Sequence, residues 1–116
     1  MKMRTKITGL REMRGQSREI SKEFERQIDN EVEKAALRVV NGAREEAPRD
    51  TGQLANSISV VDAETKMFER TVGTDLPYAA IQEFEHATKR GFLRKSLFNE
   101  RTQLRKALRK LLGKGG

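Results

Sequence analysis

The longest regular pattern in the chain is an apolar stripe that recurs at three- and four-residue steps through its first half. That spacing places apolar side chains on one face of a helix and charged side chains on the other. Ser17 is a suitable N-cap and Pro48 a suitable stop, so the pattern predicts a helix over about residues 18–46 within the segment 17–47. The stripe consists of Ile20, Phe24, Ile28, Val32, Ala35, Ala36, Val39, Val40, Ala43 and Ala47.

A helix of this length extends roughly 43 Å at 1.5 Å per residue. The chain has 116 residues, of which 35% are hydrophobic, and we interpret residues 1–116 as one small domain with a modest core. Such a domain is expected to leave part of the stripe uncovered for a partner subunit. The residues expected at this assembly interface are Ile20, Phe24, Ile28, Tyr78, Phe84 and Phe92.

The middle of the chain shows partial alternation of apolar and polar residues. Residues 55–62 and 66–73 predict two strands that form an antiparallel hairpin around residues 63–65, within the region 54–84. Residues 78–84 fit a short helix and a third strand equally well. The middle of the chain is therefore expected to form a small antiparallel sheet.

Near the C-terminus, leucines again recur at helical spacing and predict a second amphipathic helix over residues 93–112. Residues 1–16 hold few apolar positions, and we interpret them as a basic arm or an edge strand. The order helix, strands, helix predicts an α+β fold. In this fold, the long N-terminal helix and the C-terminal helix pack on a small antiparallel β-sheet.

A proline, an aspartate and a glycine close together predict a turn after the long helix. The residues that form it are Pro48, Asp50, Thr51 and Gly52. Asp-Thr-Gly is also the catalytic triplet of aspartic proteases, in which two chains share one proton between two carboxylates. Here a helix precedes the triplet, and Arg49 favours the ionised form of Asp50. Those proteases are nearly all β, so we favour a structural turn in which Asp50 caps local amides.

Charge is distributed unevenly along the chain. Residues 89–116 hold ten Lys and Arg residues against the single acid Glu100, whereas residues 1–88 hold 14 basic and 16 acidic residues. A basic segment of this kind attracts nucleic acid or an acidic protein surface, or it forms the solvated face of an amphipathic helix. The residues predicted to form a basic docking or DNA face are Arg94, Arg101, Arg105 and Arg109.

Other chemistry has little support in the sequence. The chain has no Cys and one His, which excludes disulfides, thiolate sites and multi-histidine metal sites. His86 lies beside Glu83 and Glu85, a pattern typical of a polar surface cluster. Long apolar runs are absent, so we expect a soluble, unexported chain with no membrane contact. We predict that the protein is not an enzyme and has neither a cofactor nor a metal.

Four segments together are similar to one family. Residues 47–58, APRDTGQLANSI, resemble the A-P-x-D-T-G-x-L-x-x-S-I segment of tail-completion, or head–tail joining, proteins of long-tailed siphovirus-type bacteriophages. Residues 78–84 resemble the Y-A-x-x-x-E-F segment of that family, and residues 91–97 its P-F-L-x-P-A-L segment. Residues 7–10 match I-x-G-L. The resemblance spans residues 7–112, nearly the whole chain.

The sequence departs from the family pattern at three positions. Glu85 stands where the family usually has Gly, and Gly91 and Lys95 stand where it often has Pro. The turn chemistry of residues 85–95 is therefore expected to differ from that of the family.

The resemblance implies a non-enzymatic virion part that assembles in the cytoplasm of a bacterial host. It implies a homo-oligomeric ring, commonly a hexamer, at the head–tail interface of a phage or prophage particle. The implied partners are other copies of the chain, the head connector or adaptor, and the major tail proteins. Non-specific DNA contact is a further expectation. The alternative hypothesis is a small basic nucleic-acid-binding protein that acts through residues 89–116.

Overall fold

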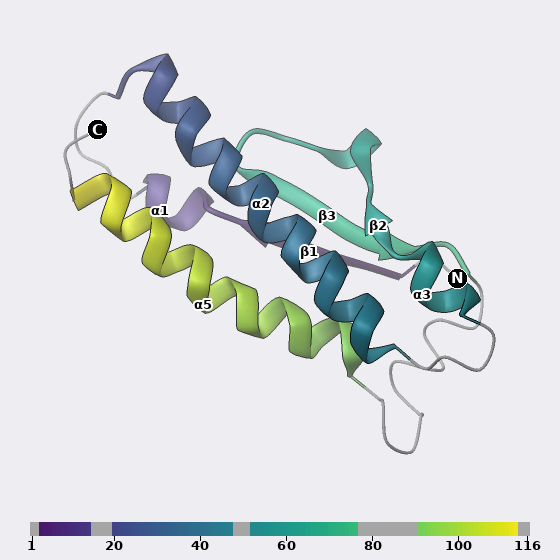
Figure 1. The fold of residues 1–116 in the computed structure, drawn as a ribbon. Helices are drawn as coiled ribbons and strands as arrows, with labels where there is room; N and C mark the ends of the chain where they lie inside the picture. The colour runs from purple at the N-terminus through teal and green to yellow at the C-terminus, as the bar shows by residue number, and fades with distance from the viewer. Residues whose placement is uncertain (1–2, 15–19, 48–51, 77–90, 114–116) are drawn as a thin grey trace.

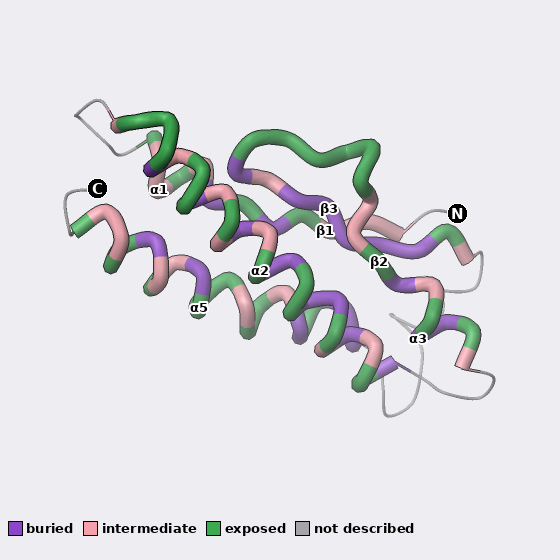
Figure 2. The backbone as a smooth tube through the Cα atoms, turned by 45° about the horizontal axis from the view of Figure 1, so that its top comes forward, coloured by how far each residue is buried: buried purple, intermediate pink, exposed green. Residues whose placement is uncertain are grey.

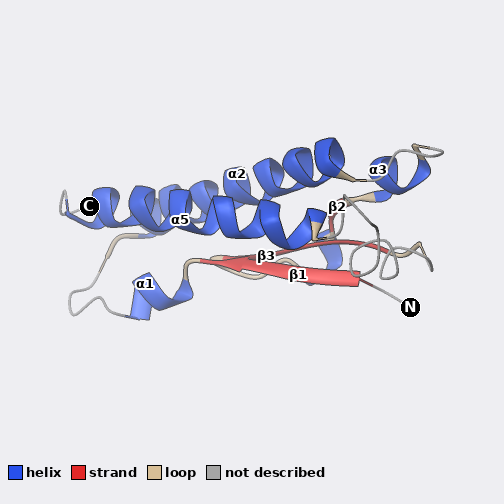
Figure 3. Cartoon of the chain, turned by 90° about the horizontal axis from the view of Figure 1, so that it is seen from below, coloured by secondary structure: helices blue, strands red, loops and turns tan. Residues whose placement is uncertain are grey.

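The computed structural model describes residues 3–14, 20–47, 52–76 and 91–113. In the described part, two long helices lie side by side and cover one face of a three-stranded antiparallel sheet (Figures 1 and 3). This arrangement confirms the predicted α+β fold. The elements are β1 (Met3–Thr8), α1 (Leu10–Arg14), α2 (Lys22–Glu46), α3 (Gln53–Ser57), β2 (Ser59–Val60), η1 (Asp62–Glu64), β3 (Glu69–Thr74) and α5 (Phe92–Gly113).

The sheet has the strand order β1-β3-β2, so β3 is its central strand. Strand β1 pairs with β3 in the register Met3↔Thr74 to Thr8↔Glu69. The N-terminal stretch is therefore an edge strand, one of the two alternatives that the sequence left open. It continues into the short helix α1, which the sequence pattern did not predict.

The predicted hairpin forms, but its first strand is much shorter than expected. Residues 53–57 form helix α3, and only Ser59–Val60 pair with β3. Gly52 adopts a left-handed conformation with φ of 73° at the N-cap of α3, which an L-residue with a side chain adopts only at a cost. Leu54 and Ile58 then lie one helical turn apart and are both buried. The partial alternation that predicted a strand over 55–62 was thus a helical turn followed by a short strand.

Helix α2 begins later than predicted, because Ser21 is its N-cap. The Ser21 hydroxyl accepts a hydrogen bond from the Phe24 amide at 3.1 Å, which satisfies a donor that the helix start would otherwise leave unpaired. Ser17 lies outside the described residues. Helix α5 extends one residue beyond each end of the predicted range.

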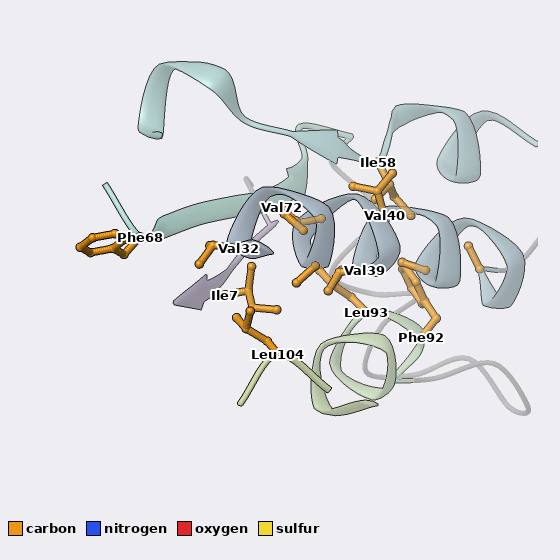
Figure 4. Packing of buried hydrophobic residues seen from close by; sticks show 14 of the residues in the cluster. Ile7, Val32, Val39, Val40, Ile58, Phe68, Val72, Phe92, Leu93 and Leu104 are labelled. Carbon is orange, nitrogen blue, oxygen red and sulfur yellow. The ribbon is translucent and has the colours of Figure 1, made fainter. Parts of the chain in front are cut away.

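The apolar stripe of α2 is covered within the chain itself, contrary to the expectation from its length. Sheet residues cover one flank of the stripe and α5 covers the other, and the buried positions line the inner side of both helices (Figure 2). Figure 4 shows Ile7 from the sheet and Leu104 from α5 lying near Val32 of α2. Predicting coverage from helix length alone failed because α5 runs alongside α2 and supplies the missing apolar surface.

The two long helices approach closely at a small residue. The Ser96 hydroxyl of α5 donates a hydrogen bond to the Val39 carbonyl of α2 at 2.8 Å. A Cβ atom on Gly42 would lie 2.5 Å from that hydroxyl oxygen and 3.5 Å from the Ser96 Cβ. Further along, Arg38 forms an ion pair with Glu100 at 2.7 Å. Gly42 therefore sets the spacing of the helix layer.

A buried arginine connects the sheet to α2. The Arg70 guanidinium, in β3, donates to both carboxylate oxygens of Asp29, at 3.0 and 2.7 Å, and to Glu33 at 3.1 Å. It also donates to the carbonyl oxygens of Lys66 and Glu69. Only 5% of Arg70 is exposed, and a buried charge needs such partners to be tolerated.

The same Asp29 carboxylate stabilises a strained turn. Phe68 is the one described residue other than glycine with positive φ, at 66°, a conformation that costs an L-residue about 1–2 kcal/mol. Its amide donates to the Asp29 carboxylate at 2.8 Å. Burial raises the pKa of Asp29, but the hydrogen bonds from Arg70 and Phe68 and the charge of Arg70 together lower it further. The net effect is a pKa below the ordinary aspartate value.

We predict that Gly42→Ala lowers the free energy of unfolding by about 1 kcal/mol, because the added methyl group displaces the buried Ser96 hydroxyl. In a Ser96→Ala background the same change should raise stability by up to about 1 kcal/mol, since alanine favours a helix over glycine. Denaturant unfolding of the four proteins in this double-mutant cycle measures the coupling. An equal effect of Gly42→Ala in both backgrounds would contradict this close approach.

We predict that Asp29→Asn lowers the free energy of unfolding at neutral pH by about 2–3 kcal/mol, because it leaves Arg70 with only Glu33 as a charged partner. Glu45→Gln, an exposed change on the same helix, is the matched control. A lowered folded-state pKa gives stability that is present above the unfolded pKa, about 3.9, and lost as pH falls through the folded pKa. The difference in free energy of unfolding between wild type and Asp29→Asn should therefore shrink as the pH falls into the acid range. A difference that does not depend on pH would refute the pairing of Asp29 with Arg70.

Candidate functional site

The most distinctive surface of the described chain is the side of α5 that faces away from α2, where Arg101 and Arg105 border α1 and the end of β1. The buried residues of α5 are Phe92, Leu93, Ser96, Leu104 and Leu108. At 100° per residue, the opposite side carries a row that we call the outer face of α5. Its members are Arg94, Phe98, Arg101, Arg105 and Arg109. The four predicted basic residues thus share one side of one helix.

The outer face carries positive charge that its own helix does not neutralise. Glu100 is the sole acid of α5, and it pairs with Arg38 on the side that faces α2. Arg105 lies 3.6 Å from the carboxylate of Glu12 in α1. Among the residues that the structure describes, Arg109 forms no ion pair. An excess of positive potential over this surface follows.

Phe98 is the most exposed large apolar side chain among the described residues, with 68% of its surface accessible. The Arg101 guanidinium lies over its ring, with the guanidinium carbon 5.8 Å from the ring centroid. Next to the ring is a shallow groove of about 610 Å³, lined by Gly91, Arg94, Lys95, Phe98 and Asn99. An aromatic ring therefore projects from the middle of a basic surface.

The sequence interpretation missed Phe98, although a signal was present. Phe98 falls outside the leucine periodicity of α5, four residues after Arg94 and three before Arg101. An apolar residue at that spacing from two arginines lies on their side of the helix.

The residues expected at an assembly interface mostly lie elsewhere. Phe24, Ile28 and Phe92 are buried in the core of the chain, which leaves little of their surface for a neighbour. Ile20 is half-buried before the start of α2. Tyr78 and Phe84 lie outside the described residues.

The residues that follow the predicted turn connect α2, α3 and the sheet. The Ser57 hydroxyl donates to the Leu54 carbonyl at 2.7 Å and lies 2.6 Å from the Thr74 hydroxyl. The Arg44 guanidinium donates twice to the Ile58 carbonyl, at 3.0 and 2.8 Å. These bonds join the C-terminal end of α2 to α3 and the sheet. Of the predicted turn residues, Gly52 is described, while Pro48, Asp50 and Thr51 lie outside the described residues. The predicted polar cluster of Glu83, Glu85 and His86 also lies outside them.

Arg4 covers one end of the β1–β3 pair. Its guanidinium donates to Asp75 at 2.6 Å and to Glu64 at 3.3 Å, and to the carbonyl oxygens of Met3 and Thr74. The hydrogen bond to Asp75 raises the pKa of Arg4, while burial lowers it less. A Cβ on Gly73 would collide with the Met3 carbonyl and the Arg4 side chain. The Arg4 side chain thus fills the space beside Gly73 at this end of the sheet.

Within the described ranges, no group of three His, Cys, Asp or Glu residues could hold a metal ion. No helix in the same ranges has the length and apolar character needed to cross a membrane.

Comparison with curated proteins gave no match, and neither did comparison with solved structures. A family model described as "Bacteriophage HK97-gp10, putative tail-component" matches residues 11–84. The matched range includes α2, α3 and the hairpin, and it ends before α5. It covers more than half of the 116 residues. The chain therefore belongs to the HK97-gp10-like family of bacteriophage tail components.

Proposed function

We propose that this tail component is a tail-completion, or head–tail joining, protein that assembles as a ring between the head connector and the tail tube. The observation that carries the proposal is the family match over residues 11–84. The similarity of residues 47–58, 78–84 and 91–97 to tail-completion segments narrows the role within the tail. The role is structural rather than catalytic, in keeping with a family of tail components.

Ring assembly is supported by how the chain buries its core and exposes other apolar groups. A closed ring requires two different patches on each subunit, because each contact is head-to-tail. Two large apolar side chains are exposed on separate elements, Leu37 on α2 and Met67 before β3. In the described part of the chain, the apolar stripe of α2 is covered by the same chain, so we propose that a subunit folds first and assembles afterwards. We propose a ring of six, in agreement with the resembled family.

The proposed partners are other copies of the chain, the head connector or adaptor, and the major tail protein. As a tail component the chain is a virion part, and we place its position within the particle at the head–tail interface. Assembly would take place in the host cytoplasm.

A second candidate function is nucleic-acid binding through residues 89–116. The observation that favours it is the row of arginines on the outer face of α5, which could follow phosphate groups. In a ring that passes DNA through its lumen, this face could contact the genome. We rank it second because the family match points to a tail structure rather than to a nucleic-acid-binding protein.

We predict that phage particles made without this protein accumulate DNA-filled heads and separate tails, because the junction lacks its connecting ring. Electron microscopy of the lysate and plaque assay measure the two effects. Supplying the wild-type gene in trans should restore joined, infectious particles, which controls for effects on neighbouring genes. Normal infectious particles from the deletion would overturn the proposed function, and a failure to package DNA would assign the protein to head assembly instead.

A further inference from the structure

We propose that the outer face of α5 is a docking surface for an acidic protein surface, with Phe98 as the apolar anchor that enters a pocket on that partner. The inference rests on the proposed function, which makes the partner another virion protein. It adds the residues that make the contact and the chemistry that they require.

The exposure of Phe98 is the first argument. Three other phenylalanines in the described part, Phe24, Phe68 and Phe92, are at least nine-tenths buried, whereas Phe98 is 68% exposed. Ser96 and Leu104 hold the opposite side of α5 in the core, so Phe98 points away from the core. An aromatic ring fixed on a rigid helix needs little ordering when it binds, which favours a role as a binding anchor.

The Phe98 ring is surrounded by positively charged side chains. Arg94, Lys95 and Arg101 are exposed beside Phe98, and the first two line the adjoining groove. Lys95 forms no ion pair with any residue in the described ranges. Protein interfaces commonly surround an aromatic anchor with polar groups at the rim. A basic rim selects an acidic partner and accelerates its association.

Phe98 also distinguishes a protein partner from DNA. Contacts to duplex phosphates come from basic and polar groups and need no aromatic ring. Stacking on bases would require single strands and usually several aromatic platforms, but α5 carries just one ring on this side. The combination of one anchor with a basic rim therefore fits an acidic protein surface better than nucleic acid.

The test measures binding of the purified full-length chain to the two particles that accumulate without it, filled heads and free tails, by co-sedimentation. Phe98→Ala should weaken binding to one of the two particles at least about tenfold. Phe98→Leu should retain much of the affinity, and Lys95→Glu should weaken binding and reduce its salt dependence. Glu45→Gln, an exposed change on α2 away from the groups proposed to bind, is the matched control and should bind that particle like wild type. Thermal unfolding should show each variant folded, because these side chains lie outside the core.

Binding to duplex DNA is measured in parallel by fluorescence anisotropy. Wild type and Phe98→Ala should bind the DNA with the same affinity. The inference is overturned if Phe98→Ala and Lys95→Glu bind both particles like wild type. It is also overturned if Lys95→Glu loses DNA binding while particle binding is intact, which would assign the surface to nucleic acid. Binding of the wild-type chain to neither particle would instead overturn the proposed function together with the inference.

Discussion

Arg70 lies in the central strand, and its buried guanidinium reaches two carboxylates on α2, which ties the sheet to the helix layer. Asp29 binds this guanidinium and also the amide of Phe68, whose positive φ turns the chain into β3. The position of β3 in turn determines that of both of its neighbours, β1 and β2. One charged group thus sets where the whole sheet lies. Because a buried charge without its partners is costly, alternative registers of β3 are disfavoured.

A closed helix layer has a functional consequence. With β3 fixed under one flank of α2 and α5 packed at Gly42 on the other, the apolar stripe is used inside the subunit. Contacts with other proteins must then be made by the groups that remain outside. In the described part, these are scattered apolar residues on α2 and near β3, and the outer face of α5 with its single ring. This division between a covered stripe and a basic outer face fits a subunit that folds alone and joins larger structures afterwards.

Periodicity predicted both long helices, since a three- and four-residue repeat over many turns has few other interpretations. It could not identify which element covers the stripe, because that depends on how α5 crosses α2. The strand expected over 55–62 failed for a local reason, since Gly52 starts a helical turn that no alternation reveals. The pairing of Asp29 with Arg70 joins residues 41 positions apart and leaves no local pattern. The spacing of the arginines predicted that they share one side of α5. It did not predict the exposure of Phe98, because the pattern of charges carries no information about a single apolar residue among them.

We propose that this tail component forms a ring at the head–tail junction and that the outer faces of its α5 helices meet another virion protein. A cryo-electron microscopy reconstruction of the junction in intact particles tests this proposal. We expect a ring of this fold between connector and tail tube, with Phe98 buried against an acidic surface of a neighbouring protein. Density for the chain at another place in the particle, or an outer face of α5 turned to solvent or to the DNA lumen, would contradict it.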